Sequence, residues 1–185
     1  RVIFNGNGYT DEWIAEAEKR GLYNLKTTPD ALPHFLDDKN VELFTKHQIF
    51  TKEELSSRYE IWLETYSKII NIESNTMVEM VQKDFLPSVF EYVDKLANTA
   101  ISKKAVISDI STETEGRLIK ELTELSGEIE KGIDSLKADT AKAKAVDDVL
   151  GCAKAYQTDV LSDMETLRKA VDTAESLIPD ALLPY

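Results

Sequence analysis

The fold is decided by residues 50–100, FTKEELSSRYEIWLETYSKIINIESNTMVEMVQKDFLPSVFEYVDKLANTA. Apolar and aromatic side chains recur along this segment mostly in steps of three and four residues, at Leu55, Tyr59, Trp62, Tyr66, Ile69, Met77 and Met80. Such spacings place side chains on one face of an α-helix, because a helix has 3.6 residues per turn. The segment therefore predicts a long helix whose apolar stripe must be covered by other helices.

Two local signals bound this helix. Thr51 and Glu54 have the spacing of a capping box, in which each side chain accepts a hydrogen bond from the backbone of the other residue. Pro87 has no backbone N–H and disfavours helical geometry at Leu86, so we expect an interruption at residues 85–87.

The whole composition favours long helices, since only 7 Gly and 5 Pro occur in 185 residues. Two later segments repeat apolar residues at helical or near-heptad spacing. We therefore expect an all-α fold, a bundle of long antiparallel helices with a short irregular or strand-like N-terminus. The helices are expected at about 51–85, 87–101, 112–143 and 148–177, after a turn and short helices in residues 1–50, all in one structural unit.

The charge excludes some classes of function. With 22 Lys and Arg against 34 Asp and Glu, the net charge of -12 argues against a nucleic-acid partner. A role in the membrane is also not expected, because no run of apolar residues reaches the ~18 that a spanning helix needs. The single cysteine, Cys152, cannot form an internal disulfide, which favours a cytoplasmic location.

The N-terminus suggests a piece of a longer protein. The chain starts at Arg1 rather than Met and enters directly a strand-like run, Arg1–Phe4. A single short strand is not stable without partners. We therefore expect these residues to belong to a sheet formed by a preceding part of the protein.

No pattern of catalytic or metal-binding residues is evident. The only histidines, His34 and His47, are thirteen residues apart and have no metal-ligand spacing, and Cys152 has no histidine near it in sequence. The paired acids at predicted helix starts are explained by the helix dipole. We therefore expect no catalytic, cofactor-binding or metal-binding residue in this chain.

Glu73 is the one acid that this reasoning does not dismiss. It falls on the predicted apolar stripe between Ile69 and Met77. A buried carboxylate needs hydrogen-bond donors or a cation beside it. Glu73 is therefore predicted to be a buried structural acid in a polar network, with a functional contact as the alternative.

Several blocks of the sequence resemble a known enzyme family. RVIFNGNGYTDEWIAEAEKRGLYNLKTTPDALPHF, residues 1–35, and FTKEELSSRYEIWLETYSKIINIESNTMVEM, residues 50–80, are similar to the C-terminal region of type III glutamine synthetases. The final PDALLPY, residues 179–185, is similar to the start of that family's C-terminal tail. The blocks occur in the family's order.

The resemblance implies a function for the whole protein. Type III glutamine synthetases form glutamine from glutamate and ammonia with ATP and a divalent metal such as Mg²⁺, and they assemble as dodecamers. Their catalytic and metal-binding motifs precede the region that this chain resembles. The resemblance therefore implies a structural and assembly role, with partners in the enzyme's own catalytic domain and in neighbouring subunits.

Tyr23 carries a second, weaker resemblance. The segment Leu22–Leu25 is similar to the part of type I glutamine synthetases that holds a regulatory adenylylated tyrosine. Tyr23 is therefore a candidate modification site, and the alternative is a packing residue between two leucines.

A function of a different class stays open from the residues themselves. A chain of this composition could be a stand-alone acidic helical module that binds other proteins, with its acidic faces directed to a basic partner.

Overall fold

The computed structural model describes residues 3–184 and consists of helices joined by short connectors. No strand occurs among residues 3–184, so the expected all-α fold is confirmed. Of the strand-like run at the N-terminus, Arg1 and Val2 lie outside the described residues, and Ile3 and Phe4 have no regular structure.

The chain divides into two compact units, residues 1–63 and 64–185. The first unit contains short helices and the beginning of a long one. Their bounds are α1 (Asp11–Lys19), α2 (Thr28–Ala31), the 3₁₀ helix η1 (Leu32–Leu36) and α3 (Asp38–Lys46). Helix α4 (Lys52–Met80) begins in this unit and continues into the second.

Aromatic side chains form the packing of the first unit. The Phe35 ring lies 5.6 Å from the Phe44 ring and 5.2 Å from the Trp62 ring, both in tilted arrangements. The predicted capping box at the start of α4 is present: the Glu54 N–H donates to the Thr51 hydroxyl at 3.2 Å, and the Thr51 N–H donates to the Glu54 carboxylate at 2.8 Å.

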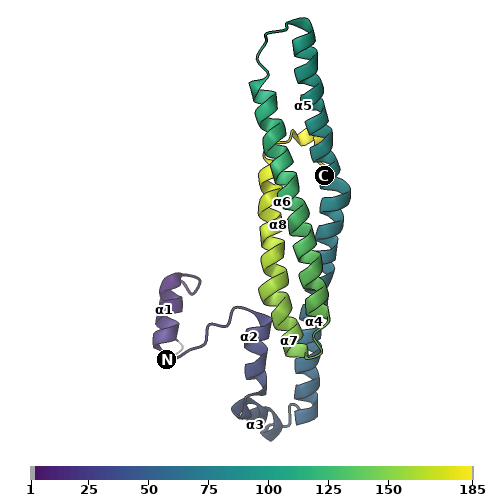
Figure 1. Cartoon of the computed structure of the whole chain (residues 1–185). Coiled ribbons are helices and arrows are strands. Elements are labelled where there is room, and N and C mark those ends of the chain that lie inside the picture. The colour runs from purple at the N-terminus through teal and green to yellow at the C-terminus, as the bar shows by residue number, and fades with distance from the viewer. Residues whose placement is uncertain (1–2, 185) are drawn as a thin grey trace. The chain divides into compact units, whose positions relative to one another are not determined.

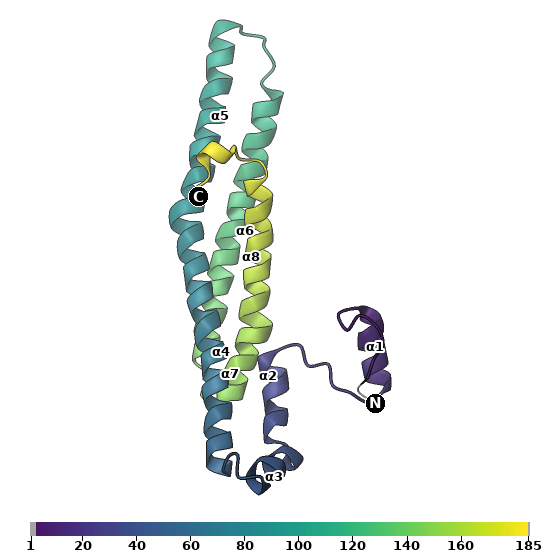
Figure 2. The ribbon, with the colours of Figure 1, turned by 180° about the vertical axis from the view of Figure 1, so that it is seen from behind.

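The second unit is a bundle of three long antiparallel rods (Figures 1 and 2). The first rod is the remainder of α4, the π turn η2 (Val81–Phe85) and α5 (Leu86–Val106). The second is α6 (Glu113–Lys144), about 48 Å long at 1.5 Å per residue. The third is α7 (Val149–Ala155), the π turn η3 (Tyr156–Val160) and α8 (Leu161–Glu175), followed by η4 (Asp180–Leu182). Helix α6 packs against both α5 and α8.

The bundle core follows a seven-residue repeat. On α6, Leu122, Ile129, Leu136 and Ala143 are almost completely buried, and each lies seven residues after the one before. The third rod shows the same repeat at Ala153, Val160, Leu167 and Ala174. A repeat of seven keeps one seam of each helix turned toward its partner, so both helices contribute continuous apolar seams to one core.

Two π turns adjust the rods without breaking them. The π turn η2 ends directly before Leu86, whose N–H donates to the Val81 carbonyl, and the helix then continues through Pro87. The expected interruption is therefore a local change of winding. The π turn η3 starts at Tyr156 and makes that residue, rather than Gln157, part of the buried seam.

The buried face of α4 in the second unit differs by one residue from the predicted apolar stripe. Its buried side chains in the second unit are Ser67, Ile70, Ser74 and Val78. Their neighbours Ile69 and Met80, which we predicted to be covered, are 50% and 53% exposed. Tyr66 and Met77 of the predicted stripe are partly buried against the core. A shift of one residue turns a helix position by about 100°, so Ile69 and Met80 lie on an outer side of the bundle. For the same reason Glu73 is exposed, and Ser74 takes the buried position expected for it.

The buried acid of the bundle is Glu115. It lies seven residues before Leu122, at the first position of the α6 repeat, and is 7% exposed. The Lys103 ammonium of α5 forms an ion pair and hydrogen bond with its carboxylate. This pair joins the end of α5 to the beginning of α6 and supplies the cation that a buried carboxylate needs.

No helix within residues 3–184 combines the length and the apolar character required to cross a membrane.

Leu122→Ala should destabilise the chain by about 2–5 kcal/mol, because it leaves a cavity at a fully buried position of the seam. Chemical denaturation would measure the free energy of unfolding. Ile101→Ala on α5 is the matched control, since Ile101 is 67% exposed and its truncation should cost about 0.5 kcal/mol or less. Equal losses for the two variants would contradict the proposed core.

Glu115→Gln should remove a pH-dependent part of the stability. The hydrogen bond from Lys103 holds the pKa of Glu115 below its ordinary value of 4.5. A lowered pKa stabilises the folded chain above the unfolded value, and this contribution is lost as the pH falls through the folded value. The melting temperature of the unsubstituted chain should therefore exceed that of Glu115→Gln at about pH 6, and the gap should narrow toward about pH 3.

The control for this experiment is Glu124→Gln, also on α6. Glu124 is 65% exposed and lies 3.9 Å from the Lys120 ammonium, so its charge should contribute little. A gap that stays constant between the two pH values, or one that Glu124→Gln reproduces, would show that the Lys103–Glu115 pair does not act as described.

Candidate functional site

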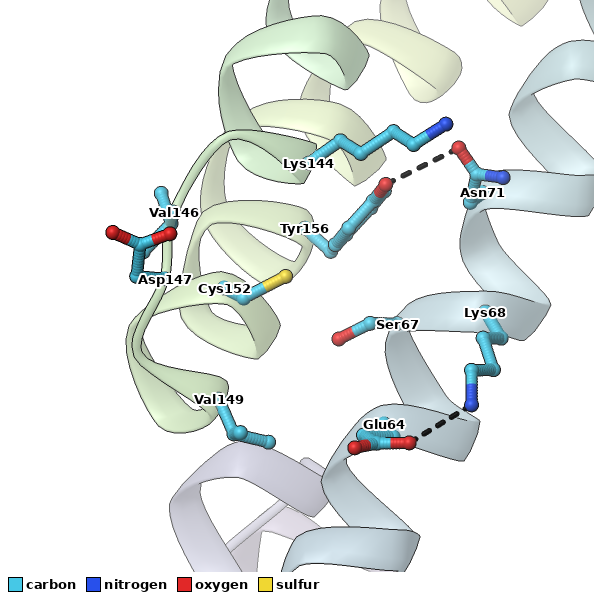
Figure 3. Close-up of a pocket in the computed structure, with 10 residues that line it drawn as sticks. All are labelled: Glu64, Ser67, Lys68, Asn71, Lys144, Val146, Asp147, Val149, Cys152 and Tyr156. Carbon is cyan, nitrogen blue, oxygen red and sulfur yellow. Dashed lines mark hydrogen bonds and ion pairs between the residues drawn. The ribbon is translucent and has the colours of Figure 1, made fainter.

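A pocket of the second unit lies between α4 and the α6–α7 connection (Figure 3). Its volume is about 230 Å³. One wall comes from α4, with Glu64, Ser67, Lys68 and Asn71. The other wall comes from the end of α6, the connector after it, α7 and η3, and holds Lys144, Val146, Asp147, Val149, Cys152 and Tyr156.

A buried tyrosine closes the inner end of this pocket. Tyr156 is 2% exposed, and its hydroxyl donates to the side-chain oxygen of Asn71 at 3.2 Å. Burial raises the pKa of Tyr156 above its ordinary value, so the phenol stays protonated and remains a donor at neutral pH. This bond links α4 to η3 across the pocket and fixes the spacing of its walls.

The charged groups of the pocket lie at its rim. The Lys68 ammonium pairs with the Glu64 carboxylate at 2.8 Å, one turn away on α4. Figure 3 shows the Lys144 side chain extending toward Asn71. Because an exposed pair within one helix is worth little, the Lys68–Glu64 pair does not rigidify the entrance.

Two potential nucleophiles line the pocket without a histidine beside them. The Cys152 sulfur and the Ser67 hydroxyl face the open space in Figure 3, but no histidine lines the pocket to act as a base for either. A serine or cysteine side chain is usually activated as a nucleophile by an adjacent base. The carboxylates and ammonium groups of the lining are those of Glu64, Asp147, Lys68 and Lys144, and Glu64 is paired with Lys68.

No set of side chains suited to bind a metal ion occurs in the described part of the chain. Among residues 3–184, no group of three or more His, Cys, Asp or Glu side chains is close enough to bind one ion. His34 lies in η1, with Nδ1 3.2 Å from the Asp37 carboxylate, and His47 follows the last residue of α3. The residues present therefore do not fit the divalent metal that the family resemblance implies for the whole enzyme.

Neither predicted site residue lines the pocket. Glu73 is on the exposed side of α4, so the prediction that it is a buried acid is wrong. Tyr23 belongs to the first unit, where it is 68% exposed and its ring stacks on His34 with 4.4 Å between ring centroids. Its modification stays a prediction.

Sequence reasoning did not identify Glu115 and Tyr156 as buried residues, although the spacing of both from the apolar seam residues indicates it. Glu115 extends the α6 seam by seven residues from Leu122, and Tyr156 precedes Val160 by four. Counting back along each seam from its apolar members would have placed both residues in the core.

Tyr156→Phe should lower the free energy of unfolding by about 1 kcal/mol, because it deletes one hydrogen bond at a buried position. Chemical denaturation at neutral pH would measure the loss. Tyr23→Phe removes the same hydroxyl from an exposed ring and should change stability by about 0.5 kcal/mol or less. A loss no larger than that of the control would show that the Tyr156–Asn71 bond does not join the walls.

Comparisons with known proteins confirm the family resemblance. The family model described as "Glutamine synthetase C-terminal domain" matches residues 1–104. The chain is 48% identical over 185 residues to "Glutamine synthetase" of Butyrivibrio fibrisolvens and 32% identical over 188 residues to "Type-3 glutamine synthetase" of Dictyostelium discoideum. It is 29% identical over 187 residues to "Glutamine synthetase" of Bacteroides fragilis.

These alignments cover 100%, 100% and 99% of this chain, but it spans only 26% of the length of each relative. The alignments with these relatives also cover helices α6 to α8, which lie beyond the part of the chain that the family model matches. From the match over more than half of its residues, the chain belongs to the glutamine synthetase C-terminal domain family.

Proposed function

We propose that this chain is the helical C-terminal part of a type III glutamine synthetase and that its role there is structural. The observation that carries the proposal is its similarity, along the whole chain, to proteins named as glutamine synthetases, one of them type 3. Since the chain spans 26% of those proteins, the proposed activity belongs to the whole enzyme. That activity is the ATP-dependent formation of glutamine from glutamate and ammonia.

The chemistry of the described residues supports a structural role. The pocket of the second unit has no histidine, and residues 3–184 hold no cluster of metal-binding side chains. The conspicuous features are instead a long apolar core and the ion pair of Lys103 with Glu115. We propose that ATP and Mg²⁺ bind to the catalytic domain of the enzyme, outside this chain.

The proposed partners follow from the same assignment. They are the catalytic domain of the same polypeptide and the neighbouring subunits of a dodecamer, in the cytoplasm. The bundle would supply a rigid body of fixed length, since its three rods share one core and α6 alone is about 48 Å long. Such a body can hold a catalytic domain or a subunit contact in place without contributing reacting groups.

The test compares the whole enzyme with the chain of residues 1–185. The whole enzyme should form glutamine from glutamate, ammonia, ATP and Mg²⁺, and residues 1–185 alone should not exceed the enzyme-free blank. Removal of this region from the whole enzyme should lower both activity and the assembled fraction seen by size-exclusion chromatography. Turnover by residues 1–185, or a whole protein that forms no glutamine, would refute the proposal.

A further inference from the structure

Helix α4 carries a second apolar face besides the one that packs in the bundle. In the second unit, Thr65, Ile69, Ile72, Thr76 and Met80 follow one another at steps of four, three, four and four residues. Such steps keep all five on one side of the helix, over about 22 Å. We call these five residues the outer stripe.

The outer stripe is exposed, and three of its five residues have large apolar side chains. Ile69, Ile72 and Met80 are 50%, 63% and 53% exposed, while Ile70, Ser74 and Val78 on the other side of the same helix are buried in the core. The stripe itself contains no charged residue. Charged side chains lie along its edges, where Glu64 pairs with Lys68 and Glu79 pairs with Lys83. An uncharged centre with charged edges is the composition of a protein–protein interface.

Helices α6 and α8 do not share this property, although α5 also exposes Phe90, Ile101 and Val106. Among the described residues of α6 and α8, no large hydrophobic side chain is exposed. Their outward positions carry ion pairs instead, such as Arg117 with Glu121 on α6 and Lys169 with Glu165 on α8. The outward sides of α6 and α8 therefore suit water, and the outward side of α4 does not.

We propose that the outer stripe is the surface on which the remaining part of the same glutamine synthetase polypeptide docks. This inference rests on the proposed function and adds which face of the bundle contacts the rest of the enzyme. The relatives are about four times as long as this chain, since it spans 26% of each, so most of their polypeptide is available as the occupant.

A second copy of this chain fits the stripe less well. Each copy carries a net charge of -12, so two copies brought face to face would repel each other. The stripe is also bordered by the acids Glu73 and Glu79, which a second copy would present again on the opposite side. Docking of the remaining polypeptide removes this conflict, because its surface need not be acidic.

The experiment measures burial of the stripe directly. Ile72→Cys places a thiol at the centre of the outer stripe, and Thr123→Cys places one at an exposed position of α6 as the matched control. Each variant is prepared in residues 1–185 and in the whole enzyme. The rate of alkylation at each position is followed by peptide mass spectrometry, which separates it from Cys152 and other thiols.

The thiol at position 72 should react at least about tenfold more slowly in the whole enzyme than in residues 1–185, because docking must open before the reagent can enter. The thiol at position 123 should react at similar rates in both. Equal rates at position 72 in the two proteins would overturn the proposal. Slow, concentration-dependent labelling at position 72 in residues 1–185 would also overturn it and assign the stripe to a second copy.

A further readout separates this inference from the proposed function. Glutamine formation by the unsubstituted whole enzyme tests the function, and the labelling rates test the docking surface. A whole protein that makes no glutamine but shields position 72 refutes the function and leaves the docking surface in place. An active enzyme in which position 72 stays reactive refutes only the docking surface.

Discussion

The seven-residue seam of α6 is the interaction on which the second unit depends. Leu122, Ile129 and Leu136 are fully buried on α6, which packs against α5, α7, η3 and α8. Burial of such side chains contributes roughly 1.5–3 kcal/mol each and is the main favourable term in folding. The other two rods each contain a π turn, and the buried residues of these turns, Val81, Phe85, Tyr156 and Val160, belong to the same core.

The polar features of the bundle are arranged around that seam and hold its ends. The Lys103–Glu115 pair joins α5 to the start of α6, and the Tyr156–Asn71 bond joins η3 to α4 near the end of α6. Both pairs satisfy groups that would be costly to bury alone. Neither pair belongs to a constellation that could carry out catalysis. In the proposed function, these features would provide stiffness and surfaces, and the reaction would take place elsewhere in the enzyme.

Individual residues show which parts of this structure could be predicted. The capping box of Thr51 and Glu54 and the buried repeat on α6 are properties of local spacing, so both could be read from the sequence. The orientation of α4 could not be read in this way. Its apolar residues occupy two neighbouring faces, and periodicity gives no reason to bury Ile70 rather than Ile69. Glu73 was placed on the wrong side for this reason, and the buried acid Glu115 was passed over.

By itself, the sequence determined the class of the fold and the family. These depend on the helical period, on Gly and Pro content, and on ordered blocks of residues, all of which are local properties of the chain. The tertiary structure alone decided which face of α4 is covered, which acid is buried and where the pocket forms. Those outcomes depend on contacts between residues far apart in the chain, such as Asn71 with Tyr156, and a helix with two apolar faces can make such contacts on either side.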